Sequence, residues 1–229
     1  MENINRIFIT GCAKSGTTLL LRLFYSFKNV EVIYRPGFDG HEISVFDLLS
    51  IDSNKEAIIS KRHPPSILSD IHSTEIEKQY DLIKKNQITI INVVRDGRDV
   101  ILSDGNWVKP ERWISCIEQR KIFKDIINFE VKFEDLVTDP DSIQDSLEKA
   151  FDLKKEFLFS DYPNFVEDWV FDWNVSVQAR KGDKKEKHNY GKRKISNSNV
   201  GKNKDAYKKL CTQNQIMIFE KCLKDLGYK

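Results

Sequence analysis

The sequence predicts an α/β fold with three layers, in which a central, mostly parallel β-sheet is flanked by helices. Short apolar runs typical of strands alternate with longer helical patterns along the chain. Residues 88–94 form a continuous apolar run of the kind that is buried in the middle of a parallel sheet. The 229 residues suffice for one sizeable core, and no Gly/Ser/Pro-rich tract divides them. We therefore expect a single domain over residues 1–229.

Each expected element follows from its local pattern. A β-rich run stops at Gly11 and is followed by an apolar stretch long enough for a buried helix. A later strand must end at the two prolines that follow it, because proline cannot donate to a strand ladder. The expected order is strand 6–10, helix 17–27, strand 31–34, helix 43–49, strand 57–60, helix 74–85, strand 88–94, a helix from 100 to 103, helix 111–127, strand 129–133, helix 142–151 and a closing helix at about 213–227.

The charge of the chain is balanced overall but uneven along it. The formal net charge is +2, which by itself argues for no polyanionic partner. Residues 180–209 hold twelve Lys or Arg against three Asp or Glu, and this pattern predicts a basic loop region. The four cysteines are scattered, with no C-x-x-C pair, so we expect neither a zinc site nor a disulfide framework. With no long apolar run and no signal-peptide pattern, a cytoplasmic protein without a membrane span is expected.

The loop after the first strand has the spacing of a phosphate-binding loop. Gly11 and Gly16 enclose four residues, as in the P-loop, whose backbone N–H groups form an anion cradle. Nucleotide-triphosphate loops carry a lysine after the second glycine, but Thr17 stands there. Lys14, inside the loop, is the available cation. The pattern suits a 5′-phosphate with a further anion attached better than it suits a magnesium triphosphate.

Two motifs resemble those of sulfotransferases that use 3′-phosphoadenosine-5′-phosphosulfate (PAPS). "AKSGTT" is similar to the family's 5′-phosphosulfate loop, P-K-S-G-T-T, with alanine in place of proline. "VVRDGRDVILS" resembles the 3′-phosphate signature, in which an arginine at a strand end precedes by eight residues a serine on the next helix. A guanidinium and a hydroxyl suit that phosphate, because both donate hydrogen bonds to its oxygens. The resemblance implies the following donor-binding residues: Ala13, Lys14, Ser15, Gly16, Thr17, Thr18, Arg95 and Ser103.

The same resemblance assigns residues to catalysis. "SKRHPPSIL", residues 60–68, is similar to the K-T-H-L-P stretch of cytosolic sulfotransferases. This similarity implies that His63 is the catalytic base and that Lys61 contacts the transferred group, while Lys14 stabilises the leaving oxygen. Other sulfotransferases use a glutamate as base, so Glu42 is the reserve candidate. No metal is required, and the product nucleotide is adenosine 3′,5′-bisphosphate (PAP).

Two further stretches resemble the family more loosely. "FEVKFEDLVTDP" is similar to its Y-E-D-L/M stretch, which implies that Phe133 lies by the adenine, although a core position is equally compatible. At the C-terminal end, "RKG" at Arg180, Lys181 and Gly182 resembles a 3′-phosphate motif of cytosolic members, while Ser198 to Gly201 resembles a different motif of bacterial members. The two alignments compete, but each predicts a basic loop that covers the cofactor.

The acceptor is not predicted beyond a small molecule, lipid or carbohydrate. Trp107, Trp113, Trp169 and Trp173 fall in segments without a motif, where they either line an acceptor pocket or belong to the core. A nucleic-acid partner is not expected, and the oligomeric state is left open. The alternatives are a P-loop kinase, which would need a lysine after Gly16, a non-catalytic polyanion-binding module, and a degenerate sulfotransferase that binds nucleotide without turnover.

Overall fold

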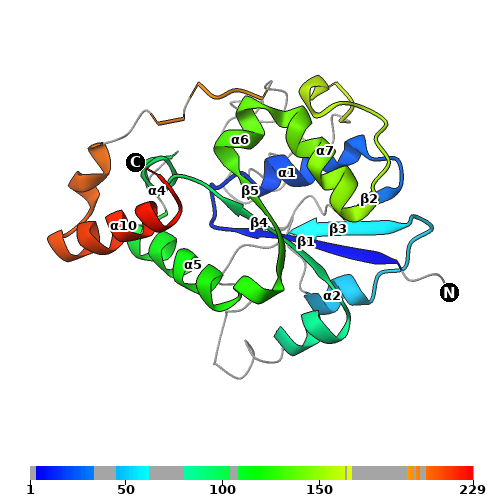
Figure 1. Ribbon diagram of the computed structural model, residues 1–229, viewed down its shortest axis with the longest axis horizontal. Coiled ribbons are helices and arrows are strands. Elements are labelled where there is room, and N and C mark those ends of the chain that lie inside the picture. The colour runs from blue at the N-terminus through cyan, green and yellow to red at the C-terminus, as the bar shows by residue number, and fades with distance from the viewer. Residues whose placement is uncertain are drawn as a thin grey trace, which may run out of the picture.

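Five parallel strands form the sheet at the centre of the computed structural model (Figure 1). The structure describes residues 4–33, 45–61, 80–103, 108–162, 164–166, 195–198, 200–201 and 205–228. The strands are β1 (Asn5–Gly11), β2 (Val30–Val32), β3 (Ala57–Lys61), β4 (Thr89–Val94) and β5 (Ile127–Lys132), in the order β2-β3-β1-β4-β5. Every neighbouring pair runs parallel, which confirms the expected sheet.

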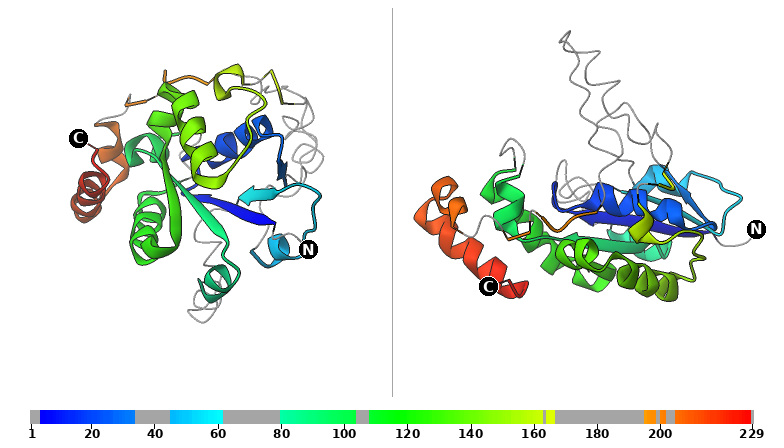
Figure 2. Two further views of the ribbon diagram at one scale, coloured as in Figure 1. Left: turned by 45° about the vertical axis from the view of Figure 1, so that its right-hand side comes forward. Right: turned by 90° about the horizontal axis from the view of Figure 1, so that it is seen from above.

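Helices cover both faces of this sheet (Figures 1 and 2). One face carries α1 (Thr17–Leu23), α6 (Phe133–Thr138) and α7 (Pro140–Phe151), and the other carries α2 (Val45–Leu49), a helical stretch at 80–85 and the end of α5 (Pro110–Ile122). The remaining elements are α4 (Gly97–Ile101), α10 (Gln213–Asp225) and the 3₁₀ turns η1 (Phe24–Ser26), η3 (Lys124–Ile126), η4 (Phe159–Asp161) and η5 (Ala206–Leu210). No helix in these described ranges is long and apolar enough to cross a membrane.

The alternation of side chains along β1 explains why the strands are apolar throughout. Ile7 and Ile9 are fully buried in the core that α1 and α7 cover, while Phe8 between them is fully buried in the core on the opposite face. Successive residues of a strand point to opposite faces, so a strand covered on both sides needs apolar residues at every position. This double burial is what the continuous apolar runs in the sequence predict.

A third core lies at the carboxyl edge of the sheet, where α10 packs against α5. Trp113 is fully buried there, with its ring centroid 4.5 Å from that of Phe219 on α10. Thr212 and Gln215 form a capping box at the start of α10, which satisfies backbone N–H groups at that end. Trp113 is therefore a core residue, whereas Trp107, Trp169 and Trp173 lie outside the described residues.

Several expected boundaries were wrong, for reasons that lie in tertiary contacts. The helix expected over 17–27 changes to a 3₁₀ turn after Leu23, because the Ser26 carbonyl accepts hydrogen bonds from the backbone of Glu156 and Phe157. Phe133 begins α6 instead of ending a strand. Ser103 follows α4 by two residues instead of lying on it, since that helix ends at Ile101.

The strand order places a crevice between β1 and β4. From β1 the chain builds β2 and β3 on one side, and it then crosses to β4 and β5 on the other. In open parallel sheets, ligands bind at the carboxyl ends of the strands where the order reverses in this way. The loop that follows β1 and the residues that follow β4 therefore meet at the expected ligand edge.

Candidate functional site

The loop between β1 and α1, residues 12–16, is a tight turn with an unusual backbone. Lys14 has φ +68° and Gly16 has φ +96°, both in the left-handed region, and the Ser15 N–H donates to the Cys12 carbonyl at 3.0 Å. Gly16 is also the N-cap of α1 and has no side chain to accept from the first N–H groups of that helix. The start of α1 therefore has no side-chain cap, which is the arrangement that an anion cradle requires.

Two glycines allow this loop to lie directly against the rest of the edge. A Cβ atom on Gly11 would lie 2.4 Å from the Val93 carbonyl oxygen of β4, and one on Gly16 would lie 2.3 Å from Cδ2 of Phe133. Carbon atoms cannot approach that closely, so no larger residue fits at either position without moving its neighbour. The glycine spacing thus reflects contacts with β4 on one side and with the start of α6 on the other.

Arg95, the residue after β4, joins the loop to Phe133. Its Nη1 donates to the Lys14 carbonyl at 2.9 Å, and its guanidinium lies over the Phe133 ring, 4.3 Å from the centroid. Burial lowers the pKa of Arg95, while the carboxylates of Asp99 and Glu134 oppose that shift. Its Nε is buried and has no hydrogen-bond partner among the described residues. A bound anion would satisfy such a donor and stabilise the positive charge.

A hydrogen-bonded network that the sequence did not reveal lies at the turn after β4, next to Arg95 in the chain. Glu134 accepts from the Asp96 backbone N–H at 2.9 Å and from the Tyr228 hydroxyl at 2.8 Å. Burial and the neighbouring Glu134 raise the pKa of Tyr228, which keeps the phenol protonated as a donor. The network thus ties the end of the described chain to the turn after β4. Glu134 stands inside a motif stretch, but only the fold brings it together with Tyr228.

The turn after β4 also fixes two further segments. Asp96 caps α4 by accepting from the Arg98 N–H and forms a 2.6 Å ion pair with the Arg98 side chain. Asp99 is buried and accepts from the Gly201 backbone N–H at 2.8 Å. The second bond anchors residues 200–201, near the end of the basic region, beside the ligand edge. Both acids belong to the "RDGRD" stretch, whose spacing alone did not assign these partners.

The remaining expected site residues are placed less completely. Lys61 is the last residue of β3, with its backbone opposite Ile9, and its side chain is almost fully buried. The Ser103 hydroxyl donates to the Val100 carbonyl at 2.7 Å. Ser15 and Thr17 are buried, and Ala13 is a core residue. His63, Glu42 and residues 180–182 lie outside the described part of the chain. In that described part, no cluster of three or more His, Cys, Asp or Glu side chains is placed to hold a metal ion.

Comparison with known proteins gives matches to structures but not to sequences. No family model matches the chain, and curated proteins give no significant match. Among solved structures, the chain is similar to the sulfotransferase domain from the Synechococcus PCC 7002 olefin synthase, with TM-score 0.60 and 16% identity over 100% of this chain and 97% of that one. It is also similar to the sulfotransferase domain from the curacin biosynthetic pathway, with TM-score 0.53 and 13% identity over 100% and 99%.

A third similar structure contains a nucleotide. It is mouse sulfotransferase SULT7A1 complexed with PAP, with TM-score 0.53 and 13% identity over 96% of this chain and 83% of that one. At these identities the likeness shows the fold, and all three structures share it over nearly the whole of this chain. The chain therefore has the fold of the sulfotransferase domains.

Proposed function

We propose that this protein transfers a sulfuryl group from PAPS to a hydroxyl or amine of an acceptor. One observation carries the proposal: the loop after β1 and the Arg95 guanidinium meet at the ligand edge of a sulfotransferase fold. The loop offers backbone donors without the lysine that a triphosphate loop carries, and Arg95 offers a partly buried cation beside it. A nucleotide with two separate anionic groups matches these two centres.

The donor would be held at three places. The 5′-phosphosulfate lies against residues 13–18, where the start of α1 lacks a side-chain cap. The 3′-phosphate lies by Arg95 and Ser103, whose hydroxyl must turn from the Val100 carbonyl to donate to it. Phe133 lies beside the adenine, and Arg180, Lys181 and Gly182 belong to the basic segment that covers the cofactor. The anchored position of Gly201 supports this last assignment, because it places one part of that segment at the ligand edge.

The transfer step uses side chains at the ends of β1 and β3. An acceptor oxygen attacks the sulfur, the bond from sulfur to the 5′-phosphate oxygen breaks, and negative charge develops on that leaving oxygen. Lys14 and the loop N–H groups stabilise this charge. Electrostatic stabilisation of this kind is usually the largest single contribution to the rate of such reactions. His63 takes the acceptor proton, and its imidazole suits the task because its usual pKa lies near neutrality. Lys61, buried at the end of β3, holds the sulfuryl oxygens.

The kinase alternative is weaker on both sequence and structure. A triphosphate loop needs a lysine at position 17, where the buried Thr17 begins α1. A polyanion-binding module would leave the contact between Arg95 and Lys14 without a purpose. Both alternatives nevertheless make distinct predictions, since a kinase needs magnesium and a polyanion complex weakens steeply with salt.

Calorimetric titration tests the proposal directly. The purified protein is titrated with PAP, ADP and ATP, each with magnesium and with a chelator. We expect tight, magnesium-independent preference for PAP, and a hundredfold excess of PAP over its dissociation constant raises the free energy of unfolding by about 2.7 kcal/mol. Preference for ATP with magnesium would overturn the proposal in favour of a kinase.

Variants then separate binding from chemistry. Lys14→Ala is expected to abolish sulfuryl transfer, whereas His63→Ala is expected to lower turnover and leave PAP affinity nearly intact. Full activity of the His63 variant would remove that residue from the role of base, and Glu42→Gln would then be tested in its place. PAP binding without transfer to any of a panel of phenols, alcohols, amines and sugars would indicate a nucleotide-binding protein without turnover.

A further inference from the structure

Two thiols that the proposed reaction does not use meet beneath the glycine loop. Cys12 is part of that loop, and Cys116 lies in the middle of α5. Their side chains are in hydrogen-bonding contact, and both line the small cavity that Gly11 and Ser15 also border. Each thiol is about 95% buried, with exposed fractions of 4% for Cys12 and 5% for Cys116. This pair could not be predicted from the sequence, because the two cysteines are far apart along the chain.

The environment makes one of the two thiols the better nucleophile. The hydrogen bond from Cys12 lowers the pKa of Cys116, and the positive charge of Arg112 lowers it further against the effect of burial. The same hydrogen bond, together with burial, raises the pKa of Cys12. Since the thiolate is the reactive form of cysteine, this difference favours Cys116 as the attacking thiol and Cys12 as its partner.

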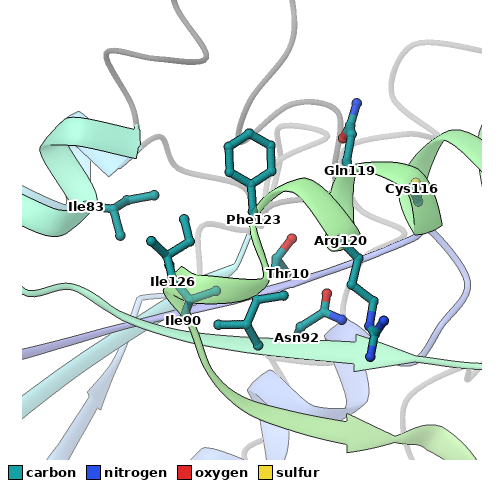
Figure 3. Close-up of a pocket in the computed structure, with 10 residues that line it drawn as sticks. Thr10, Ile83, Ile90, Asn92, Cys116, Gln119, Arg120, Phe123 and Ile126 are labelled. Atoms are coloured by element: carbon teal, nitrogen blue, oxygen red, sulfur yellow. The ribbon is translucent and has the colours of Figure 1, made fainter. Parts of the chain in front are cut away.

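Cys116 also lines a second small cavity (Figure 3). It has a volume of about 40 Å³ and lies between β1, β4 and α5, with Thr10, Phe123 and Gln119 among its lining residues. A cavity holds a water molecule once it reaches about 10–15 Å³, so this one admits a molecule the size of hydrogen peroxide. It is too small for a bulky disulfide reagent, which makes the expected reaction selective for small oxidants.

We propose that Cys12 and Cys116 form a reversible thiol–disulfide site that controls the glycine loop. The Cys116 thiolate attacks a hydroperoxide, the O–O bond breaks, and Cys116 becomes a sulfenic acid as the alcohol or water leaves. The Cys12 thiol then attacks that sulfur and displaces water, which gives the disulfide. Two thiols and one hydroperoxide thus yield one disulfide, one water and one alcohol, or two waters from hydrogen peroxide, and a dithiol reductant reverses the change.

The disulfide would change the shape of the anion cradle. An S–S bond is about 2.05 Å long, well below the separation of two thiols in hydrogen-bonding contact, so its formation draws Cys12 toward α5. The Cys12 carbonyl accepts from Ser15, while Arg95 holds the other side of the loop through the Lys14 carbonyl. A loop fixed at one side and pulled at the other cannot keep its donors in place. We expect oxidation to weaken nucleotide binding at least about tenfold, which corresponds to about 1.4 kcal/mol.

The experiment compares reduced, peroxide-treated and re-reduced protein. Peptide mapping by mass spectrometry without reduction identifies any disulfide, and PAP titration measures binding in each state. The expected result is a Cys12–Cys116 peptide, at least tenfold weaker PAP binding, and recovery of both after dithiothreitol. Cys116→Ala is expected to bind PAP as the reduced protein does and to be insensitive to peroxide. Cys222→Ala, which removes another buried thiol of the same core, is expected to keep the response.

Two outcomes would overturn this inference. One is that peroxide yields no Cys12–Cys116 peptide, or a disulfide between other cysteines. The other is that the disulfide forms and PAP affinity stays the same. The loss of affinity rests on the proposed function, but the covalent site does not. If even the reduced protein fails to bind PAP, the proposed function fails, and hydrogen exchange of residues 12–18 in the two states then decides whether the disulfide alters the loop.

Discussion

The guanidinium of Arg95 lies 4.3 Å from the centroid of the Phe133 ring and donates to the carbonyl of Lys14 at 2.9 Å. One side chain thereby connects the end of β4, the start of α6 and the loop after β1. Such a contact between a planar cation and a ring contributes about 0.5–2 kcal/mol, depending on how far water is excluded. Arg95 is therefore expected to shape the loop as well as to contact a ligand.

Replacing Arg95 with lysine tests this double role. Lys keeps the positive charge but loses the planar fork and the stacking on Phe133. We expect Arg95→Lys to weaken PAP binding by about 10- to 100-fold, or about 1.4–2.8 kcal/mol, measured by calorimetry. Arg6→Lys is the matched control, because Arg6 also donates to backbone carbonyls but lies near the amino end of β1. Equal losses of affinity in the two variants would contradict a specific role for Arg95.

A methyl group on Gly16 is expected to disrupt the loop. Gly16→Ala adds left-handed strain of about 1–2 kcal/mol and drives a Cβ atom into Phe133, so the loss of stability should exceed the strain alone. Gly201→Ala carries similar strain at φ +70°, but its Cβ would meet nothing within 4 Å. Urea denaturation compares the two free energies of unfolding. A Gly201 variant as unstable as the Gly16 variant would show that the contact with Phe133 is unimportant.

Removing the Tyr228 hydroxyl is expected to destabilise the turn after β4, because Glu134 then loses one of its two hydrogen-bond donors. A hydrogen bond to a carboxylate contributes about 1.5–3 kcal/mol, so Tyr228→Phe should destabilise the fold by that order and also weaken PAP binding through Glu134. Tyr207→Phe removes a similar bond, from Tyr207 to Glu220, within the α10 region. Thermal unfolding and PAP titration of both variants provide the comparison. Only the Tyr228 variant should lose affinity for PAP. Unchanged PAP affinity in that variant would show that the bond between Tyr228 and Glu134 does not contribute to nucleotide binding.

The buried lysine at the end of β3 is expected to act in the chemical step. Lys61→Met should lower sulfuryl transfer by about 10²–10³-fold, the usual effect of deleting one stabilising donor, with little change in PAP affinity. Lys55→Met removes an exposed lysine that donates to the Lys28 carbonyl, and it should leave turnover unchanged. Single-turnover kinetics with PAPS measures the step. Wild-type rates in the Lys61 variant would rule out its contact with the transferred group.

Local sequence patterns predicted most of the sheet and the loop. A strand that is buried on both faces is apolar at nearly every position, and such a run is easily recognised in the sequence. The run 88–94 became β4, and the glycines at 11 and 16 enclose the loop as expected. Patterns failed where long-range contacts decide the backbone. The early end of α1 depends on hydrogen bonds from residues 156 and 157, and the residues around α1 in the sequence do not indicate these bonds.

The candidate site was predictable in its parts but not in its connections. Lys14, Arg95 and Phe133 were identified from separate motifs, and in the fold Arg95 contacts both the Lys14 carbonyl and the Phe133 ring. The expectation that Ser103 lies on a helix was wrong, because α4 has only five residues and ends before it. The bonds of Glu134 and the contact of Cys12 with Cys116 join distant segments, so they depend on topology that a single sequence does not display.

The bond between Tyr228 and Glu134 spans 94 residues, and this distance has a consequence for how the protein is made. A ribosome completes α6 long before Tyr228 emerges from its exit tunnel. The sheet can form during synthesis, but the hydrogen bond from Tyr228 to Glu134, beside the turn that carries Arg95, can form only after Tyr228 has left the ribosome. Nucleotide added during translation is therefore expected to protect this edge from proteolysis only after Tyr228 has left the ribosome.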